Sequence, residues 1–383
     1  MAKMVDRIAL AGASLGTQRH LLVHRYQPGK AAADPRKVYI QASLHADELP
    51  GMMAVHHLLA LLDAADRDGA LRQEIVVVPV ANPVGLAQVI NGYHAGRADL
   101  SGNGNFNRNW PDLFAGLQDR VEGKLGKDVA ANKAVIRSAI AAGIAERKDP
   151  GEADQLKLAL VQLAHDADMV LDVHCDDDSL MHLYMPMENW ADYNDLAAEL
   201  GAVACMTAND SGSFCFDETF ALPWNKLRAA IGDKFPVPAA PFVTTLELRG
   251  QPDVFDDFGA TDAKAIYRFL QRHGVIAGDP GPAPKLLCTA TPLDAADVPL
   301  SPSSGLLAYK RNLGDQVKKG DLLAELIDPL AEDVAKARTP IYSANDGLIL
   351  SRRQHKLVKA GDYVNMIVGT EVLAHRTAKL MTD

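Results

Sequence analysis

A buried strand that leads directly into a helix is the feature of this sequence that most constrains its fold. Residues Val38–Leu44 form an apolar run typical of a strand covered on both faces. The helical pattern of Met52–Ala65 follows Pro50, and proline suits the first turn of a helix because its missing N–H has no partner there. This order of strand, turn and helix predicts an α/β domain.

The turn between this strand and this helix contains His45 and Glu48. Two such side chains, three residues apart at the rigid end of a strand, can bind the same small cation. Zinc sites for hydrolysis commonly use three protein ligands and leave the fourth position open. The pair therefore indicates a His/Glu/His zinc site whose second histidine lies elsewhere in the chain.

Chain length and charge limit the classes of protein to consider. The 383 residues exceed the usual size of one hydrophobic core, so we expect two domains. The net charge of −10 argues against a nucleic-acid surface but not against a small anionic substrate held by local arginines. We see no membrane span and no signal sequence, and the four cysteines lack a CxxC pair. A cytoplasmic protein is expected, with homo-oligomer formation left open.

Apolar strands alternate with helical segments over the first 280 residues, which predicts a sheet covered by helices on both faces. The expected strands are 38–44, 74–80, 169–174 and 243–249, and the expected helical segments are 52–65, 115–167, 190–204 and 260–273. The Pro/Gly-rich segment 278–284 is the best linker candidate. We therefore predict a catalytic domain over residues 1–280 and a small all-β domain over residues 285–383.

The third metal ligand is expected from the strand that contains Asp172 and His174. Their spacing of two residues places both side chains on one face, at the end of a buried strand. Ligands bind at such strand ends in open α/β sheets. We predict that His174 completes the zinc site and that Asp172 orients this histidine without binding the metal itself. A core histidine without a ligand role is the competing interpretation, and His182 is the reserve ligand.

Hydrolysis at an open zinc site also needs a carboxylate beside the attacking water. Glu247 lies within an otherwise apolar strand, where a carboxylate is costly unless it has a partner or a function. We predict that Glu247 is the general base. The alternative is a structural ion pair between Glu247 and Arg249.

The segment 91–111 is rich in Gly, Asn and Arg, which is typical of a recognition loop held by strands. Within it, Arg108 and Asn107 could bind a carboxylate, because a guanidinium offers two parallel N–H donors. Arg97 could supply a second charge or stabilise an oxyanion.

These motifs, in this order, resemble the succinylglutamate desuccinylase/aspartoacylase family, which is part of the zinc carboxypeptidase-like superfamily. The resemblance extends over residues 30–275 and implies a carboxypeptidase-like α/β/α sandwich around a mixed sheet. It implies one Zn²⁺ per chain on His45, Glu48 and His174, and Glu247 as general base. It further implies that Asn107 and Arg108 hold the substrate carboxylate, and that Arg97 polarises the scissile carbonyl.

These motifs are compatible with three functions. The family cleaves small anionic N-acyl amino acids, and this chain is most similar to bacterial deacylases such as the N-acetyl-diaminobutyrate deacetylases of ectoine breakdown. A metallocarboxypeptidase acting on peptide C-termini would use the same zinc and base. A binding module that has lost the chemistry is disfavoured, because all three metal ligands and the base are present. The helical segment 115–167 and the displaced Arg97 are departures that leave the acyl group and the amino acid open.

The C-terminal part resembles a biotinyl/lipoyl-type barrel, because Gly-Asp turns punctuate short strands. Lys336 stands where those domains have their modified lysine. However, the segment 328–338 is longer than the tight hairpin that such modification requires. We therefore expect an unmodified barrel that flanks the mouth of the active site or forms an oligomer interface.

Overall fold

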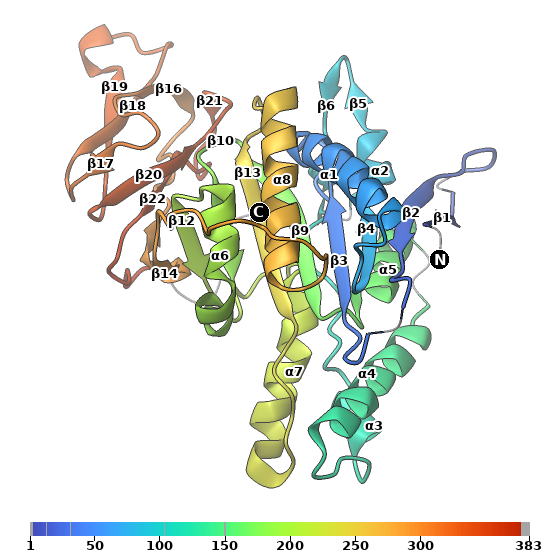
Figure 1. Ribbon diagram of the computed structural model, residues 1–383. Coiled ribbons are helices and arrows are strands. Elements are labelled where there is room, and N and C mark those ends of the chain that lie inside the picture. Colours follow the sequence, from blue (N-terminus) through green and yellow to red (C-terminus); the bar gives the residue numbers. More distant parts are fainter. Residues whose placement is uncertain (1–2, 13, 31, 103, 149–150, 377–383) are drawn as a thin grey trace.

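The computed structural model describes residues 3–12, 14–30, 32–102, 104–148 and 151–376. Its centre is a nine-stranded mixed sheet (Figure 1). The strands follow the order β1 (Met4–Ala9), β2 (His20–Tyr26), β4 (Glu74–Val78), β3 (Lys37–Ala42), β9 (Met169–Asp176), β13 (Phe242–Gly250), β11 (His182–Met185), β12 (Ala204–Thr207) and β14 (Ala290–Pro292). The central strands β4, β3, β9 and β13 are parallel, so their carboxyl ends lie at one edge of the sheet.

Helices cover both faces of this sheet, and an apolar core lies under each set. One set consists of α1 (Pro50–Arg67), α6 (Trp190–Leu200) and α8 (Asp256–Arg272). The other consists of α3 (Leu117–Val121), α4 (Val129–Ala145), α5 (Glu152–Ala164) and α7 (Glu218–Ile231). Leu58 and Phe269 belong to the first core, and Leu160 and Trp224 to the second. The predicted α/β fold with a large mixed sheet is confirmed.

Local sequence signals set the helix ends. Pro50 occupies the first turn of α1, as predicted. The side chain of Asp128 accepts a hydrogen bond from the backbone N–H of Ala131 at 2.7 Å and so caps α4. The helix predicted for 190–204 is too long: α6 ends before Gly201, which adopts a left-handed backbone with φ 67°. Ala204 already begins β12.

The segment between β4 and α3 lies over the carboxyl edge of the sheet. It consists of α2 (Pro83–Leu86) and two short hairpins, β5 (Val89–Ile90) with β6 (Tyr93–His94) and β7 (Ala98–Asp99) with β8 (Gly104–Asn105). The backbone N–H of Ala46 donates to the carbonyl of Gly96 at 3.1 Å. This bond ties the predicted recognition loop to the turn that follows β3.

The C-terminal part is all-β, but the predicted closed barrel is not confirmed among the described residues. Its strands form two sheets. The first contains β10 (Asp178–Ser179), β15 (Ala296–Asp297), β17 (Gln316–Val317), β20 (Gly347–Arg352) and β22 (Asn365–Val368), and the second contains β16 (Gly305–Tyr309), β18 (Leu322–Ile327), β19 (Arg338–Tyr342) and β21 (Leu357–Val358). Gly-Asp turns indicate where strands end, and they do not determine whether the sheet closes.

The two parts of the chain exchange strands. β14 joins the large sheet beside β12, and β10 pairs with β20 in the C-terminal part. The division of the chain at residues 280–285 therefore stays a prediction. Lys336 lies in the connection between β18 and β19, where its ammonium is 3.3 Å from Asp333 and its side chain is 85% exposed. None of the helices in the described ranges combines the length and the apolar character needed to span a bilayer.

Candidate active site and metal centre

The three predicted metal ligands converge at the carboxyl edge of the sheet. His45 and Glu48 lie in the turn between β3 and α1, and His174 lies on β9, which pairs with β3 in parallel. All three are buried, and their ligand atoms lie within 4.8 Å of one another. Nδ1 of His45 is 2.8 Å from Oε1 of Glu48, and Nδ1 of His174 is 2.7 Å from Oε2. Both imidazoles therefore direct the same nitrogen toward one carboxylate.

Neighbouring side chains hold each imidazole by its other nitrogen. Oδ1 of Asn105 accepts a backbone hydrogen bond from Asn107 at 2.8 Å, which identifies this atom as the amide oxygen. Nε2 of His45, 2.8 Å away, must then be the protonated nitrogen, so Nδ1 keeps a free lone pair. Nε2 of His174 lies 2.9 Å from the carboxylate of Asp172, as predicted. Sequence reasoning missed Asn105, although it lies only two residues before Asn107.

The carboxylate of Asp172 is itself held in place. Its Oδ1 accepts a hydrogen bond from the amide of Gln41 at 2.9 Å, and the carbonyl of that amide accepts from the hydroxyl of Tyr39 at 2.9 Å. All three side chains are buried in the sheet. His174 thus faces a carboxylate that hydrogen bonds from β3 hold in place.

Electrostatics favour a charged carboxylate between two imidazoles. Burial opposes ionisation of Glu48, but His45 and His174 lower its pKa. Burial lowers the pKa of His45 to about 4, so this ring is neutral. For His174, burial acts in the same direction, but Asp172 and Glu48 raise its pKa well above the ordinary value. A metal ion held by these residues would have to displace a proton from His174.

Arg97 reaches the same group of ligands. Its Nη1 is 3.1 Å from Oε1 of Glu48 and 3.3 Å from Nδ1 of His45. The side chain is 46% exposed and lines the pocket above the ligands. The structure thus brings Arg97 to the site despite its displacement in the sequence.

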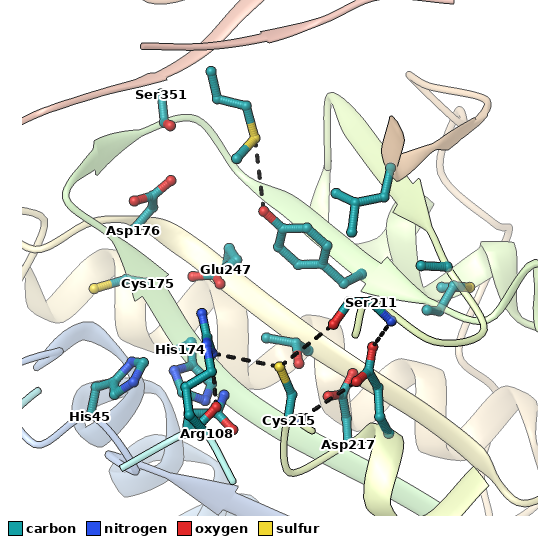
Figure 2. A pocket seen from close by; sticks show the side chains of 18 of the residues that line it. His45, Arg108, His174, Cys175, Asp176, Ser211, Cys215, Asp217, Glu247 and Ser351 are labelled. Atoms are coloured by element: carbon teal, nitrogen blue, oxygen red, sulfur yellow. Dashed lines mark hydrogen bonds between the residues drawn. The ribbon is translucent and has the colours of Figure 1, made fainter. Parts of the chain in front are cut away.

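Asn107 and Arg108 line the same pocket and are buried. The amide oxygen of Asn107 accepts the backbone N–H of Phe216 at 2.8 Å. Nη1 of Arg108 donates to the carbonyl of Asn107 at 2.8 Å and lies 3.5 Å from the sulfur of Cys215. Figure 2 shows Arg108 in the pocket that also contains His174, with a dashed line that marks its contact with Cys215. We call Asn107 and Arg108 the clamp.

Glu247 lies beside His174 because β13 pairs in parallel with β9, and the two residues are opposite each other. Its carboxylate lines the pocket, and Oε2 is a buried atom without a hydrogen-bond partner among the described residues. Burial and the charge of Glu48 raise the pKa of Glu247 well above its ordinary value. The guanidinium of Arg249 instead pairs with Asp262, at 2.5 Å. The contacts therefore do not support the alternative of a Glu247–Arg249 pair.

His182, the reserve ligand, is not part of the metal-binding group found in the described residues. It lies on β11 opposite Glu247, and its Nδ1 is 2.8 Å from the carbonyl of Leu180. Burial lowers the pKa of His182 to about 4, so the ring is a neutral core histidine.

The far wall of the pocket comes from segments that sequence reasoning did not assign to the site. Asp217, just before α7, and Glu218, its first residue, line the pocket, and Figure 2 shows Asp217 on the side away from His45. The C-terminal part adds Leu293, Val298, Ser351, Tyr363 and Met366. The hydroxyl of Tyr363 donates to Asp177 at 2.5 Å, which ties this wall to the end of β9. No sequence motif connects these residues with the metal ligands.

The donor set fits zinc better than a hard cation. Two imidazole nitrogens and one carboxylate are typical zinc ligands, whereas magnesium and calcium prefer oxygen ligands alone. The fixed tautomer of His45 and the carboxylate behind His174 are further features of zinc sites. His45, Glu48 and His174 are therefore the residues that could hold such an ion.

The fold and the buried His–Glu–His group define a mixed α/β protein with a candidate site for one metal ion. Residues 34–133 match the family model described as "Succinylglutamate desuccinylase/Aspartoacylase catalytic domain", in agreement with the family predicted from the sequence motifs. The matched segment contains His45 and Glu48 and ends before His174 and Glu247. The family is one of deacylases that act on N-acyl amino acids.

Solved structures share the fold over almost the whole chain. A succinylglutamate desuccinylase/aspartoacylase family protein from Shewanella amazonensis has a TM-score of 0.80 at 24% identity, covering 96% of this chain and 98% of its own. The ectoine utilization protein EutE (DoeB) from Ruegeria pomeroyi, bound to its product, has a TM-score of 0.67 at 17% identity, covering 95% and 94%. A succinylglutamate desuccinylase/aspartoacylase from Rhodobacter sphaeroides has a TM-score of 0.63 at 16% identity, covering 95% of each chain. No curated protein matches the chain.

Proposed function

We propose that this protein is a zinc-dependent amidohydrolase that removes an acyl group, of the acetyl or succinyl type, from a small N-acyl amino acid. The observation that supports this proposal best is that one pocket contains the group His45, Glu48 and His174, the clamp, and the carboxylate of Glu247. Zinc, when bound, acidifies a water molecule and polarises a carbonyl.

Residues of the pocket bind the substrate, transfer the proton and stabilise the developing charge. The clamp holds the α-carboxylate of the substrate and so places the amide bond beside His174. Glu247, with its raised pKa, takes a proton from the attacking water and passes it to the departing amine. Arg97 stabilises the negative charge that develops on the carbonyl oxygen.

The walls of the pocket favour a small substrate over a peptide. Ser351 and Tyr363 of the C-terminal part and Asp217, just before α7, also line it. A carboxypeptidase needs space for a chain that extends beyond the scissile bond. The deacylase therefore remains our proposal, and the carboxypeptidase is the alternative to test.

Release of free amine from acetyl-, succinyl- and formyl-amino acids by the zinc-loaded protein tests this function. We expect turnover of at least one N-acyl amino acid and none of blocked dipeptides of similar size. Turnover of the dipeptides alone would support the carboxypeptidase, and absence of both activities would refute hydrolysis at this site.

A further inference from the structure

The helical segment 115–167 provides a buried lysine that contacts the backbone of the clamp. Lys157 lies on α5 and is only 7% exposed. Its ammonium donates a hydrogen bond to the carbonyl oxygen of Arg108 at 2.7 Å and lies 5.8 Å from the ring centroid of Trp110. The contact joins two segments that are 49 residues apart in the sequence.

The burial of this lysine calls for an explanation. Burial lowers the pKa of Lys157, because an ammonium away from water loses hydration. Among the buried residues of α5, Lys157 is the one charged side chain, and the rest are Ala, Leu and Val. An apolar residue would fill the same space without this cost. The hydrogen bond to Arg108 is the contact that only a donor can make.

The backbone at this point has an uncommon conformation. Asn109, the next residue, has a left-handed backbone with φ 55°. Residues other than glycine adopt this conformation uncommonly, although asparagine does so more often than most. The carbonyl of Arg108 belongs to the peptide that enters this turn, so its direction depends on what holds it. The ammonium of Lys157 supplies a charge-assisted bond to that oxygen.

The other side of the clamp is held independently. The ring of Trp110 packs against Phe216 with centroids 4.7 Å apart, and the backbone N–H of Phe216 donates to the side chain of Asn107. The backbone N–H of Trp110 donates to the carbonyl of Phe214 at 3.1 Å. These contacts position Asn107 and Trp110, whereas the hydrogen bond from Lys157 holds the carbonyl of Arg108.

We infer that Lys157 is a positioning residue that fixes the Arg108 peptide and thereby sets the affinity for the substrate carboxylate. This inference rests on the proposed function of the clamp. It gives the helical segment a role at the active site. Lys157 of α5 contacts the clamp through a hydrogen bond, although no residue of α5 is among those that line the pocket.

The test compares the wild-type protein with Lys157→Met, which keeps the length of the side chain and removes the donor. Each protein is given an N-acetyl amino acid and its uncharged α-carboxamide. We expect Lys157→Met to raise KM for the acid about tenfold, to change kcat less than twofold and to leave KM for the amide unchanged. The preference for acid over amide thus falls about tenfold, while the zinc content stays the same.

The matched control is Lys133→Met on α4, which removes an ion pair with Asp168 at 2.6 Å in the same helical segment. Loss of stability alone would affect both variants and both substrates alike. An unchanged preference for the acid in Lys157→Met, or an equal loss in Lys133→Met, would overturn the inference.

Hydrogen exchange separates this inference from the proposed function. In Lys157→Met, the backbone amides of residues 108–110 are expected to exchange at least tenfold faster than in Lys133→Met. If the wild-type protein hydrolyses no N-acyl amino acid, the proposed function fails, and exchange alone decides whether Lys157 anchors Arg108. Equal exchange rates in the two variants would refute the anchoring.

Discussion

At the scale of single residues, the environment of each carboxylate gives it a different role. Glu48 lies between two imidazoles that lower its pKa, so it remains ionised and suits a metal ligand. Glu247 is next to it in the pocket, but burial and the charge of Glu48 raise its pKa. A carboxylate with a raised pKa can accept and return a proton near neutral pH. The register of β13 on β9 places Glu247 opposite His174, which contacts Glu48.

The role of Glu247 is tested by Glu247→Gln, which keeps the shape of the side chain and removes the base. We expect kcat to fall by about 10²–10⁴-fold, because proton transfer by a positioned group contributes about this much. Zinc content, measured by elemental analysis, is expected to equal that of the wild-type protein. Turnover at the wild-type rate would remove Glu247 from the mechanism.

Asp217 provides a prediction about stability and pH. It is 8% exposed, and burial together with the neighbouring Glu218 raises its pKa from the ordinary value of about 4 to about 7. The folded state therefore keeps this proton to higher pH than the unfolded state, and the free energy of unfolding falls as pH rises from about 4 to about 7.

In Asp217→Asn this loss is absent. We compare the free energy of unfolding of Asp217→Asn with that of the wild-type protein. Their difference is expected to be about 3 kcal/mol larger at pH 8 than at pH 5, in favour of the variant, since each pKa unit corresponds to about 1.4 kcal/mol. Urea unfolding at the two pH values measures it, with Asp233→Asn, at an exposed position, as the control. A gain that is the same at both pH values would contradict a raised pKa at Asp217.

At the scale of elements, the sequence predicts those parts of the site that follow directly from a strand or a helix. Continuous apolar runs place His45 and His174 at the ends of β3 and β9, and Pro50 places the start of α1. Convergence then follows because neighbouring parallel strands end at one edge. The far wall has no such signal: α7 contains Pro223 in its interior, and Tyr363 reaches the pocket through the packing of the C-terminal sheets.

The contact between the loop at Gly96 and the turn after His45 belongs to this scale. A Cβ at Gly96 would lie 2.4 Å from the backbone nitrogen of Asp47, so any side chain forces the two segments apart. We expect Gly96→Ala to lower stability by about 1–3 kcal/mol and to weaken zinc binding, because the turn between His45 and Glu48 must shift. Urea unfolding and zinc titration measure the two effects.

Gly126→Ala is the control for this change, because a Cβ at Gly126 meets nothing within 4 Å. Normal zinc affinity in Gly96→Ala would show that the loop does not support the turn.

At the scale of the whole molecule, the site is assembled from both parts of the chain. The large sheet and the turn after β3 supply the ligands and Glu247. The segment between β4 and α3 supplies Arg97 and the clamp, and the C-terminal part supplies one wall. The sequence predicts the α/β fold because periodicity reports burial on both faces. It does not determine whether the C-terminal sheets close or what shape the pocket has, because both depend on how distant segments pack.

Elemental analysis of zinc in the purified protein and in His174→Ala tests the central claim most directly. We expect about one zinc per chain in the wild-type protein, close to none in His174→Ala, and the full content in the control His20→Ala, whose histidine is exposed on β2. A wild-type protein that binds no zinc when the metal is supplied, or full zinc content in His174→Ala, would contradict the account.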